Sequence, residues 1–170
     1  MVNSRVRSFP PIEDRNAETL ILGSMPGVAS LAAGQYYAYP HNAFWRIIAE
    51  LLKFDASAPY PARVKALKSA RIAVWDVLHS CRRPGSLDAK IEHDTALVND
   101  FEPFFHRHKR ISRVFFNGAT AEGLFRRHVQ RKLDLHPINY QRLPSTSPAN
   151  ASATYRQKLR AWRSIVNQRN

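Results

Sequence analysis

The sequence predicts an α/β fold, a three-layer α/β/α sandwich with a central four-stranded parallel sheet. Two observations, read with one rule of fold topology, support this prediction. Short apolar runs alternate with longer segments whose apolar residues recur at helical spacing. Each apolar run ends in a turn rich in Gly, Pro, Ser or Asn. Strands that alternate with helices form a parallel sheet covered on both faces.

The first strand is expected at Thr19–Leu22, after a polar segment, residues 1–16, that we place along the surface. A Gly/Pro turn and a loop rich in aromatic and amide side chains follow. A helix is then expected over Pro40–Lys53, because proline suits a first helical turn. The apolar residues on one face of this helix are Phe44, Ile47, Ile48, Leu51 and Leu52. We expect Phe44 and Trp45 to lie in the core.

The rest of the chain repeats the alternation. The expected elements are, in order, a helix over Pro61–Ser69, a strand over Arg71–Val77, a loop over Leu78–Lys90, a helix from Asp94 or Thr95 to Phe105, a strand over Ser112–Phe116, a helix to about Lys132, a strand over Ile138–Leu143 and a helix from about Ala151. Open α/β sheets bind ligands at the carboxyl ends of their strands. The segments expected at that edge are Gly23–Gly27, Trp75–Asp76, Asn117–Gly118 and Leu143–Asn150.

The 170 residues are most simply a single domain, and the charge is unusual. Lysine and arginine number 26 against 13 acidic residues, a net charge of +13. Residues 103–170 alone hold 14 basic and 2 acidic side chains. This imbalance favours a nucleic-acid partner over a basic surface that only aids solubility. The outer face of the last helix is expected to carry Arg156, Lys158, Arg160 and Arg163.

Cysteine content and hydropathy indicate the cellular compartment and the relation to membranes. One cysteine, Cys81, excludes an internal disulfide and favours a reducing compartment. The N-terminus has no apolar signal region, and no window approaches a membrane span of about 18 apolar residues. We therefore expect a cytoplasmic protein of bacterial or archaeal type, bound to no membrane. No obligate protein partner is evident, and we expect a monomer.

Several catalytic motifs are missing from the sequence. The turn Gly23–Gly27 lacks the Gly-Lys-Ser/Thr ending of a P-loop and is too short for a dinucleotide fingerprint. The histidines form no HExxH, and His106 and His108 are spaced wrongly to share a helix face. No nucleophile-elbow pattern surrounds Ser145 or Ser147.

Aromatic and amide side chains beside a basic surface remain as the candidate site. Tyrosines can stack on a planar base while amides and carboxyls bond its edge, as enzymes that extrude a base require. The side chains concerned are Tyr36, Tyr37, Tyr39, Asn42, Asp76 and Asn117. For Tyr36 and Tyr39, packing and a pocket role are equally open. From the residues alone, the chain is a nucleic-acid protein that handles a base.

Two longer motifs carry a family resemblance. The first is GSMPG at Gly23–Gly27 followed by QYYAYPHNAFW at Gln35–Trp45, and the second is LPSTSPAN at Leu143–Asn150. They resemble the motifs of the uracil-DNA glycosylase superfamily, most closely its hypoxanthine-DNA glycosylase branch. Trp75–Leu78 and Phe115–Gly118 are similar to the intervening strand ends. The resemblance covers about residues 19–166.

The resemblance implies a function. It implies a monofunctional glycosylase that flips a deaminated base out of DNA and hydrolyses its N-glycosidic bond, without metal or cofactor. Hypoxanthine from deoxyinosine is the leading substrate, in base excision repair. Two alternatives stay open: a uracil or mismatch-uracil glycosylase, and a non-catalytic binder of damaged or single-stranded DNA.

The resemblance also implies roles for individual residues. Met25 stands where other branches carry a water-positioning Asp or Asn, and a thioether is a weak acceptor. We therefore assign catalysis to Asn42, whose oxygen would orient water while its amide contacts the base or the backbone. A helix-start role for Asn42 is the alternative. Tyr37 matches the aromatic that stacks on the flipped base.

The remaining site residues follow from the same motifs. Asp76 stands where uracil enzymes carry an Asn, which argues against a uracil-reading edge; a pairing with Arg82 or Arg83 is equally open. The expected base-binding residues are Gly23, Ser24, Met25, Gly27, Tyr37, Asp76 and Asn117. The expected DNA-backbone residues are Ser145, Thr146, Ser147 and Asn150. Ser147 falls near the position of an apolar wedge, for which serine is poorly suited.

Overall fold

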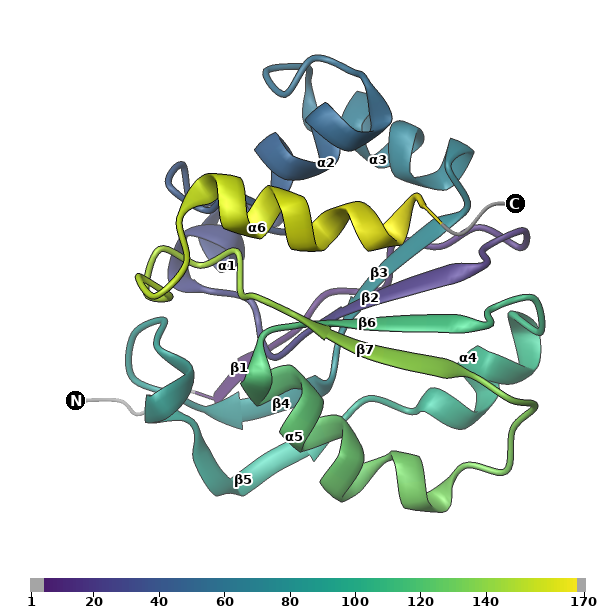
Figure 1. The fold of residues 1–170 in the computed structure, drawn as a ribbon. Helices are drawn as coiled ribbons and strands as arrows, with labels where there is room; N and C mark the ends of the chain where they lie inside the picture. The colour runs from purple at the N-terminus through teal and green to yellow at the C-terminus, as the bar shows by residue number, and fades with distance from the viewer. Residues whose placement is uncertain (1–4, 168–170) are drawn as a thin grey trace.

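A parallel sheet forms the centre of the protein, whose computed structural model describes residues 5–167. Its strands are β2 (Thr19–Gly23), β3 (Ile72–Asp76), β6 (Arg113–Asn117) and β7 (Asn139–Leu143). They lie in the order β3-β2-β6-β7 (Figure 1). Parallel neighbours need a crossover connection, and helices supply it here. All four strands were expected within one or two residues of their observed bounds.

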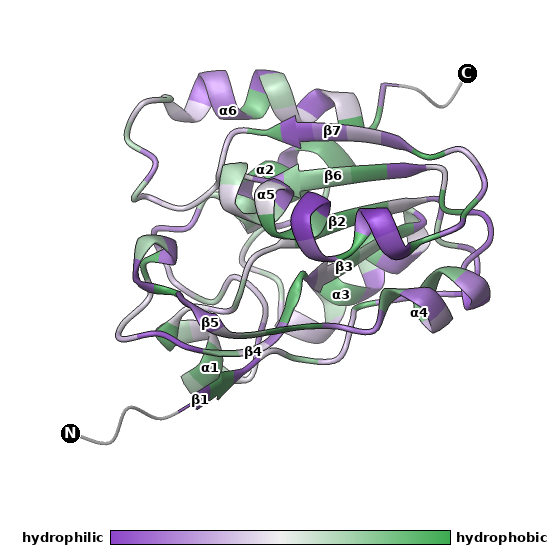
Figure 2. Cartoon of the chain, turned by 90° about the horizontal axis from the view of Figure 1, so that it is seen from below, coloured by the Kyte–Doolittle hydropathy of each residue, from purple (hydrophilic) through white to green (hydrophobic). Residues whose placement is uncertain are grey.

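Helices cover both faces of the sheet. In Figure 1, α2 (Phe44–Leu52), α3 (Tyr60–Ser69) and α6 (Tyr155–Trp162) lie above the sheet. Below it lie α4 (Phe101–Arg107) and α5 (Ala119–His128), and α5 turns a hydrophilic surface outward in Figure 2. The predicted fold class, an α/β sandwich with a four-stranded parallel sheet, is confirmed. A short helix, α1 (Val28–Ala33), was not expected.

A second, antiparallel sheet lies beside the first. It contains β1 (Arg5–Arg7), β4 (Leu78–Arg82) and β5 (Glu92–Val98) in the order β1-β4-β5. The N-terminal segment thus pairs with β4, and its Ile12 is buried and bridges to Val74 of the central sheet. Residues 5–16 therefore lie mostly at the surface, as expected, but they are tied to both sheets; residues 1–4 of the predicted segment lie outside the described residues.

The strand register brings the polar turns together. Gly23 lies opposite Asp76 across β2 and β3, and Asn117 lies opposite Leu143 across β6 and β7. Leu22 pairs with Phe116, which places the two pairs at the same edge. The four predicted strand-end segments therefore meet at the carboxyl edge of the sheet, as the sequence indicated.

Two predictions between β3 and β6 were wrong. Leu78–Lys90 was expected to be a loop, but its first five residues form β4 between two antiparallel partners. A helix was expected from Asp94 or Thr95 to Phe105, but this region holds β5 and then α4, with Asp100 at the helix start. Pro103 explains the later start, since proline is tolerated in the first turn of a helix and not in its interior.

Helix starts were also placed too early. The helix predicted from Pro40 begins at Phe44, because its first i→i−4 hydrogen bond runs from Ile47 N to the carbonyl of the N-cap residue Ala43 at 2.9 Å. The N–H groups of residues 42 and 43 instead donate to Tyr39 O at 2.9 Å and to Thr146 O at 3.0 Å. The last helix begins at Tyr155, where Thr154 and Gln157 form a capping box. The helix predicted to end near Lys132 ends at His128, and residues 130–132 form a 3₁₀ turn.

Aromatic packing joins the layers. Phe44 and Trp45 are buried, as expected, and Phe44 meets Trp162 of α6 edge to face with ring centroids 5.9 Å apart. On the other face, Phe101 of α4 meets Phe125 of α5 in the same way at 5.3 Å. The indole N–H of Trp162 also donates to Pro144 O at 2.9 Å. Trp162 thus links the core to the turn after β7.

Replacing Trp162 by alanine should lower the free energy of unfolding by about 3–5 kcal/mol, because it empties the space between α2 and α6. Trp162→Phe should cost about 1–2 kcal/mol, since it keeps an aromatic ring and loses the hydrogen bond to Pro144. Urea denaturation followed by circular dichroism measures both. Equal losses for the two variants would contradict the packing role.

Candidate functional site

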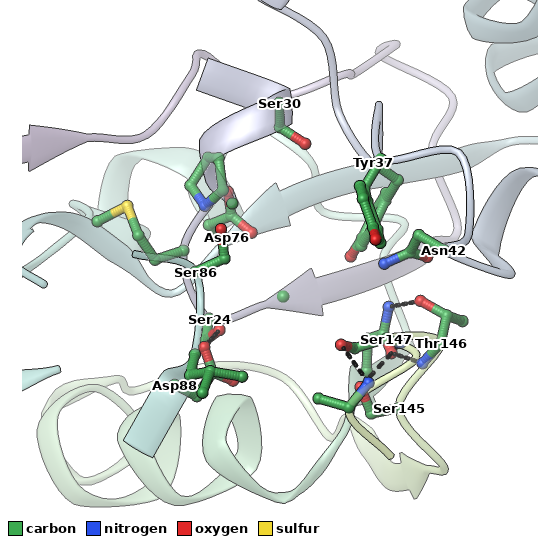
Figure 3. A pocket seen from close by; sticks show the side chains of 18 of the residues that line it. Ser24, Ser30, Tyr37, Asn42, Asp76, Ser86, Asp88, Ser145, Thr146 and Ser147 are labelled. Atoms are coloured by element: carbon green, nitrogen blue, oxygen red, sulfur yellow. Dashed lines mark hydrogen bonds between the residues drawn. The ribbon is translucent and has the colours of Figure 1, made fainter. Parts of the chain in front are cut away.

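A cavity of about 360 Å³ opens at the carboxyl edge of the central sheet. Its size falls at the lower end of the range for small-molecule sites. Every residue that the sequence assigned to the site lines it: Gly23, Ser24, Met25, Gly27, Tyr37, Asn42, Asp76, Asn117, Ser145, Thr146, Ser147 and Asn150. Figure 3 shows Asn42 and residues 145–147 across the cavity from Ser24 and Asp88.

The floor of the cavity depends on the missing side chain of Gly23. A Cβ atom at Gly23 would lie 2.5 Å from Asp76 Oδ1 and 3.0 Å from the Tyr37 hydroxyl. Real Cβ atoms do not come this close to a carboxylate oxygen, so only glycine allows both side chains to reach this point. Gly23 lies in β2 and has no positive φ, so its backbone conformation does not demand glycine. The first motif needs glycine here because a side chain would have no space.

Tyr37 is held in an uncommon backbone conformation. Its φ is +55°, in the left-handed region that bulky residues rarely occupy. One face of its ring stacks on Phe44, with centroids 3.9 Å apart and planes inclined by 19°. The ring is thereby fixed against the core, while its hydroxyl is buried without a hydrogen-bond partner in the described residues. The strained backbone and the unpaired polar atom together make Tyr37 a candidate functional position.

Asp76 is a second buried group that is not fully satisfied. Its Oδ2 has no hydrogen-bond partner, and no ion pair joins it to Arg82 or Arg83 within residues 5–167. The pKa of Asp76 is raised to about 7, chiefly by burial and also by the nearby Asp88, while Arg83 acts in the opposite direction. Near neutral pH the carboxyl is therefore partly protonated, and it can donate as well as accept a hydrogen bond.

Asn42 lies at the turn before α2. Its Oδ1 accepts a hydrogen bond from the Phe44 N–H at 3.0 Å, which assigns the other side-chain atom as the NH₂ group. That group points toward the cavity in Figure 3. Asn42 thus supports the helix start and also offers a donor to whatever fills the cavity.

The side chains of Asn117 and Thr146 pair with each other. Asn117 Nδ2 donates to Thr146 Oγ1, and Thr146 N donates to Asn117 Oδ1, both at 2.9 Å. Thr146 O also accepts from Ala43 N at 3.0 Å, next to Asn42. Thr146 is buried. These bonds lock the end of β6 and both motif loops into one unit.

Hydrogen bonds between residues close in sequence, and one from Lys158, shape the rest of the second motif. Ser145 Oγ accepts from Ser147 N, and Ser147 Oγ accepts from Ala149 N, both at 3.2 Å. Asn150 Nδ2 donates to Ser145 O at 3.3 Å. Lys158 Nζ donates to Ser147 O at 3.1 Å from a buried position, and burial lowers the pKa of Lys158. Lys158 therefore supports the loop and does not belong to the exposed face predicted for α6.

Sequence reasoning missed one wall of the cavity, the segment Ser86–Ala89. Asp88 Oδ1 accepts from Ser24 Oγ at 2.7 Å, and Ser86 Oγ accepts from Val28 N at 2.8 Å. Two arginines followed by Pro-Gly-Ser-Leu-Asp signalled a turn with polar groups, but nothing in that pattern indicated which loop it would face.

Arg83 holds this wall against the first motif. Its side chain is fully buried, donates to Met25 O at 3.3 Å and to Pro26 O, and lies 3.8 Å from Asp88 Oδ1. The described residues contain no cis peptide bond, so the Gly27 N–H points away from the Pro26 carbonyl and hence from Arg83. The guanidinium therefore sets the orientation of the peptide groups in the Gly/Pro turn.

Tyr36 and Tyr39, left open by the sequence, separate clearly. Tyr36 is buried and donates its hydroxyl to the backbone carbonyls of Phe9 and Pro10, although its edge touches the cavity. Tyr39 is exposed at the rim and meets His41 edge to face.

Within residues 5–167, no helix is long and apolar enough to cross a membrane. The same residues contain no group of three or more His, Cys, Asp or Glu side chains that could hold a metal ion.

The raised pKa of Asp76 predicts how stability depends on pH. A carboxyl with a pKa near 7 in the folded state and 3.8 in the reference state binds its proton more tightly when folded. Its contribution to the free energy of unfolding therefore falls as pH rises from about 4 to about 7, by up to ~1.4 kcal/mol per pH unit. Asp76→Asn should remove this dependence.

Denaturation midpoints at pH 5, 6 and 7 test the prediction. The stability of the wild type relative to Asp76→Asn should decline across this range. Asp134→Asn, at an exposed aspartate far from the cavity, is the matched control. Parallel curves for wild type and Asp76→Asn would contradict the raised pKa.

Comparisons with known proteins agree with this geometry. The family model of the uracil DNA glycosylase superfamily matches residues 10–169. The hypoxanthine DNA glycosylases of Methanosarcina barkeri (strain Fusaro) and Methanosarcina acetivorans are 39% and 37% identical to this chain over 116 residues. Each alignment covers 68% of this chain and 72% of the relative.

A solved structure shows the same fold. The solution NMR structure of a Methanosarcina acetivorans protein thought to be a uracil DNA glycosylase matches with a TM-score of 0.74 and 31% identity. The match covers 95% of this chain and 99% of that one. The family match, which spans most of the chain and includes every loop of the cavity, means that this protein belongs to the uracil DNA glycosylase superfamily.

Proposed function

We propose that this protein is a hypoxanthine-DNA glycosylase: it flips deoxyinosine out of DNA and hydrolyses the N-glycosidic bond to leave an abasic site. That it is a DNA glycosylase acting on deaminated bases follows from its family and its relatives. The choice of hypoxanthine is supported by the two relatives of that name. The observation that carries the proposal is the single cavity into which both sequence motifs converge.

The floor of the cavity offers unpaired groups to a base edge. Asp76 Oδ2 and the Tyr37 hydroxyl are buried without partners in the described residues, and buried polar groups are normally satisfied. A bound base would supply the missing bonds. A partly protonated Asp76 can accept from the N1–H of hypoxanthine and donate to its neighbouring carbonyl oxygen. The ring of Tyr37, backed by Phe44, gives the base a rigid aromatic wall.

Asn42 acts on the bond that breaks. Its NH₂ group, free of the bond that holds Oδ1 to Phe44, donates to the departing base, and the second lone pair of Oδ1 is left to orient water. Met25 lines the same turn and brings no oxygen to position water. As charge develops on the base, the Gly27 N–H, turned away from Arg83, adds a second donor.

The DNA strand lies over the second motif. Ser145, Thr146, Ser147 and Asn150 line the cavity next to the sugar position, in a loop held rigid by its own hydrogen bonds. Backbone N–H groups and hydroxyls in such a loop contact phosphate oxygens and position the strand without reading sequence. The net charge of +13 supplies the long-range attraction.

Uracil is the second candidate substrate. The carboxyl of Asp76 was expected to disfavour uracil because a carboxylate only accepts hydrogen bonds. With its pKa near 7 it also donates, so the same lactam edge of uracil can pair with it. The Methanosarcina acetivorans protein of the solution NMR structure is itself thought to be a uracil DNA glycosylase. The assay below ranks the two bases.

Single-turnover excision from duplexes that carry one deoxyinosine, deoxyuridine or deoxyxanthosine tests the proposal. Strand cleavage after alkali should be fastest for deoxyinosine, because both Methanosarcina relatives are named hypoxanthine DNA glycosylases. Faster release of uracil would replace hypoxanthine by the second candidate. Tight, salt-dependent binding without release of any base would leave a DNA-binding protein and overturn the enzymatic proposal.

Asn42→Ala should lower the single-turnover rate by about a hundredfold or more, as loss of a donor to developing charge does in other enzymes. DNA binding should change little. Asn42→Asp is the matched variant, because its carboxylate still accepts from Phe44 N while it removes the donor and adds negative charge. It should be as inactive as Asn42→Ala.

The two variants separate the roles of Asn42. Activity retained by Asn42→Asp alone would assign the function to the oxygen and hence to water orientation. Activity retained by both would remove Asn42 from the chemistry. Urea denaturation of each variant shows whether the start of α2 has survived.

A further inference from the structure

Three exposed side chains with large apolar groups lie at the cavity or beside a segment that lines it. In the described residues the large hydrophobic side chains that are exposed are Val28, Tyr39, Leu87 and Leu97. Tyr39 and Leu87 line the cavity, and Val28 is joined to Ser86 by the hydrogen bond from its N–H. Leu97 lies in β5, away from the cavity. Apolar groups gathered at the mouth of a site mark a contact surface.

Leu87 is the most rigidly presented of the three. The residue is 52% exposed and yet forms part of the cavity wall, so it stands at the mouth. Both neighbours are anchored, Ser86 to Val28 N at 2.8 Å and Asp88 to Ser24 Oγ at 2.7 Å. An exposed leucine on an anchored turn has lost its backbone freedom before binding, which lowers the cost of inserting it into a partner.

The other residues at the mouth are less suited to insertion. Val28 has a shorter, branched side chain and begins the short helix α1. The ring of Tyr39 already contacts His41, with centroids 5.5 Å apart. Ser147, which lies near the family's wedge position, uses its hydroxyl to hold Ala149 N and has no apolar surface to insert.

The charge around Leu87 fits a nucleic-acid partner. Arg82 and Lys90, on either side of the turn, are exposed, and Arg83 between them is buried. Exposed cations beside an apolar tip are the combination that proteins use to bind phosphates while a side chain enters the base stack. Asp88, the acidic residue of the turn, is bonded to Ser24 and faces the cavity.

We propose that Leu87 is the wedge of this glycosylase, the side chain that enters the DNA stack and fills the space of the flipped nucleotide. This inference rests on the proposed function. It moves the wedge from the second motif to the turn between β4 and β5, on the opposite wall of the cavity. Leucine is among the side chains that proteins insert between base steps. Flipping then leaves the base in the cavity and Leu87 in the gap.

The test compares duplex and single-stranded DNA. Leu87→Ala should slow single-turnover excision from a deoxyinosine duplex by about tenfold to a hundredfold, the apolar contribution of one buried leucine. On a single-stranded deoxyinosine oligonucleotide, where the flipped base leaves no gap in a duplex, the loss should be at least about fivefold smaller than on the duplex. Leu87→Phe should restore most of the duplex rate, and Leu97→Ala should match wild type on both.

A second readout does not depend on catalysis. A 2-aminopurine beside the deoxyinosine becomes brighter when the stack opens, so wild type should raise its fluorescence on binding and Leu87→Ala should not. This keeps the wedge testable even if the wild type releases no base, an outcome that would count against the proposed function alone. A Leu87→Ala variant with wild-type duplex rate and fluorescence, or with equal losses on duplex and single strand, would overturn the wedge.

Discussion

The site depends on one buried junction, the hydrogen bonds of Thr146. Its N–H and hydroxyl pair with the two ends of the Asn117 amide, and its carbonyl accepts from Ala43. Three segments far apart in the sequence meet in these three bonds: the end of β6, the loop after β7 and the turn that carries Asn42. A buried donor or acceptor that lost its partner here would cost ~1–3 kcal/mol. The junction therefore holds the first and second motifs in a fixed relation.

The opposite wall is held by charge instead of amide pairing. Arg83 is buried with its guanidinium on two carbonyls of the Gly/Pro turn and 3.8 Å from Asp88. Desolvating such a cation is costly unless carbonyls and a carboxylate surround it. The arrangement ties the turn between β4 and β5 to the first motif, and with it the floor of the cavity to the surface that carries Leu87. In the function proposed above, this one wall both shapes the cavity and faces the DNA.

Much of this architecture could be predicted because its signals are local. The four apolar runs and the turns after them placed the central sheet and its ligand edge, and the spacing around Asn42 and Ser145 carried the family motifs. The second sheet could not be predicted, since β4 and β5 have mixed polar sequences that become strands only through each other and β1. Pairing of that kind is decided by tertiary packing rather than by propensity.

The same limit explains what was missed in the cavity. Asn117 and Thr146 were both predicted to be site residues and both line the cavity, but their mutual bonds require β6 and the loop after β7 to be neighbours. The pKa of Asp76 required the burial of its carboxyl beside Asp88, which no sequence pattern revealed. An argument from residue type alone therefore treated Asp76 as an acceptor, whereas its environment makes it a donor as well.

Unpaired groups at the floor set the balance between stability and function. Asp76 Oδ2 and the Tyr37 hydroxyl are buried without partners in the described residues, and Tyr37 adds an unfavourable φ. Each destabilises the free protein, because a buried polar group without a hydrogen bond is costly. In the function proposed above, a base that enters the cavity removes this cost by supplying partners, so the lost stability becomes binding energy directed at the base edge. The rigid junction at Thr146 and the buried Arg83 allow the protein to carry that strain without collapsing the cavity.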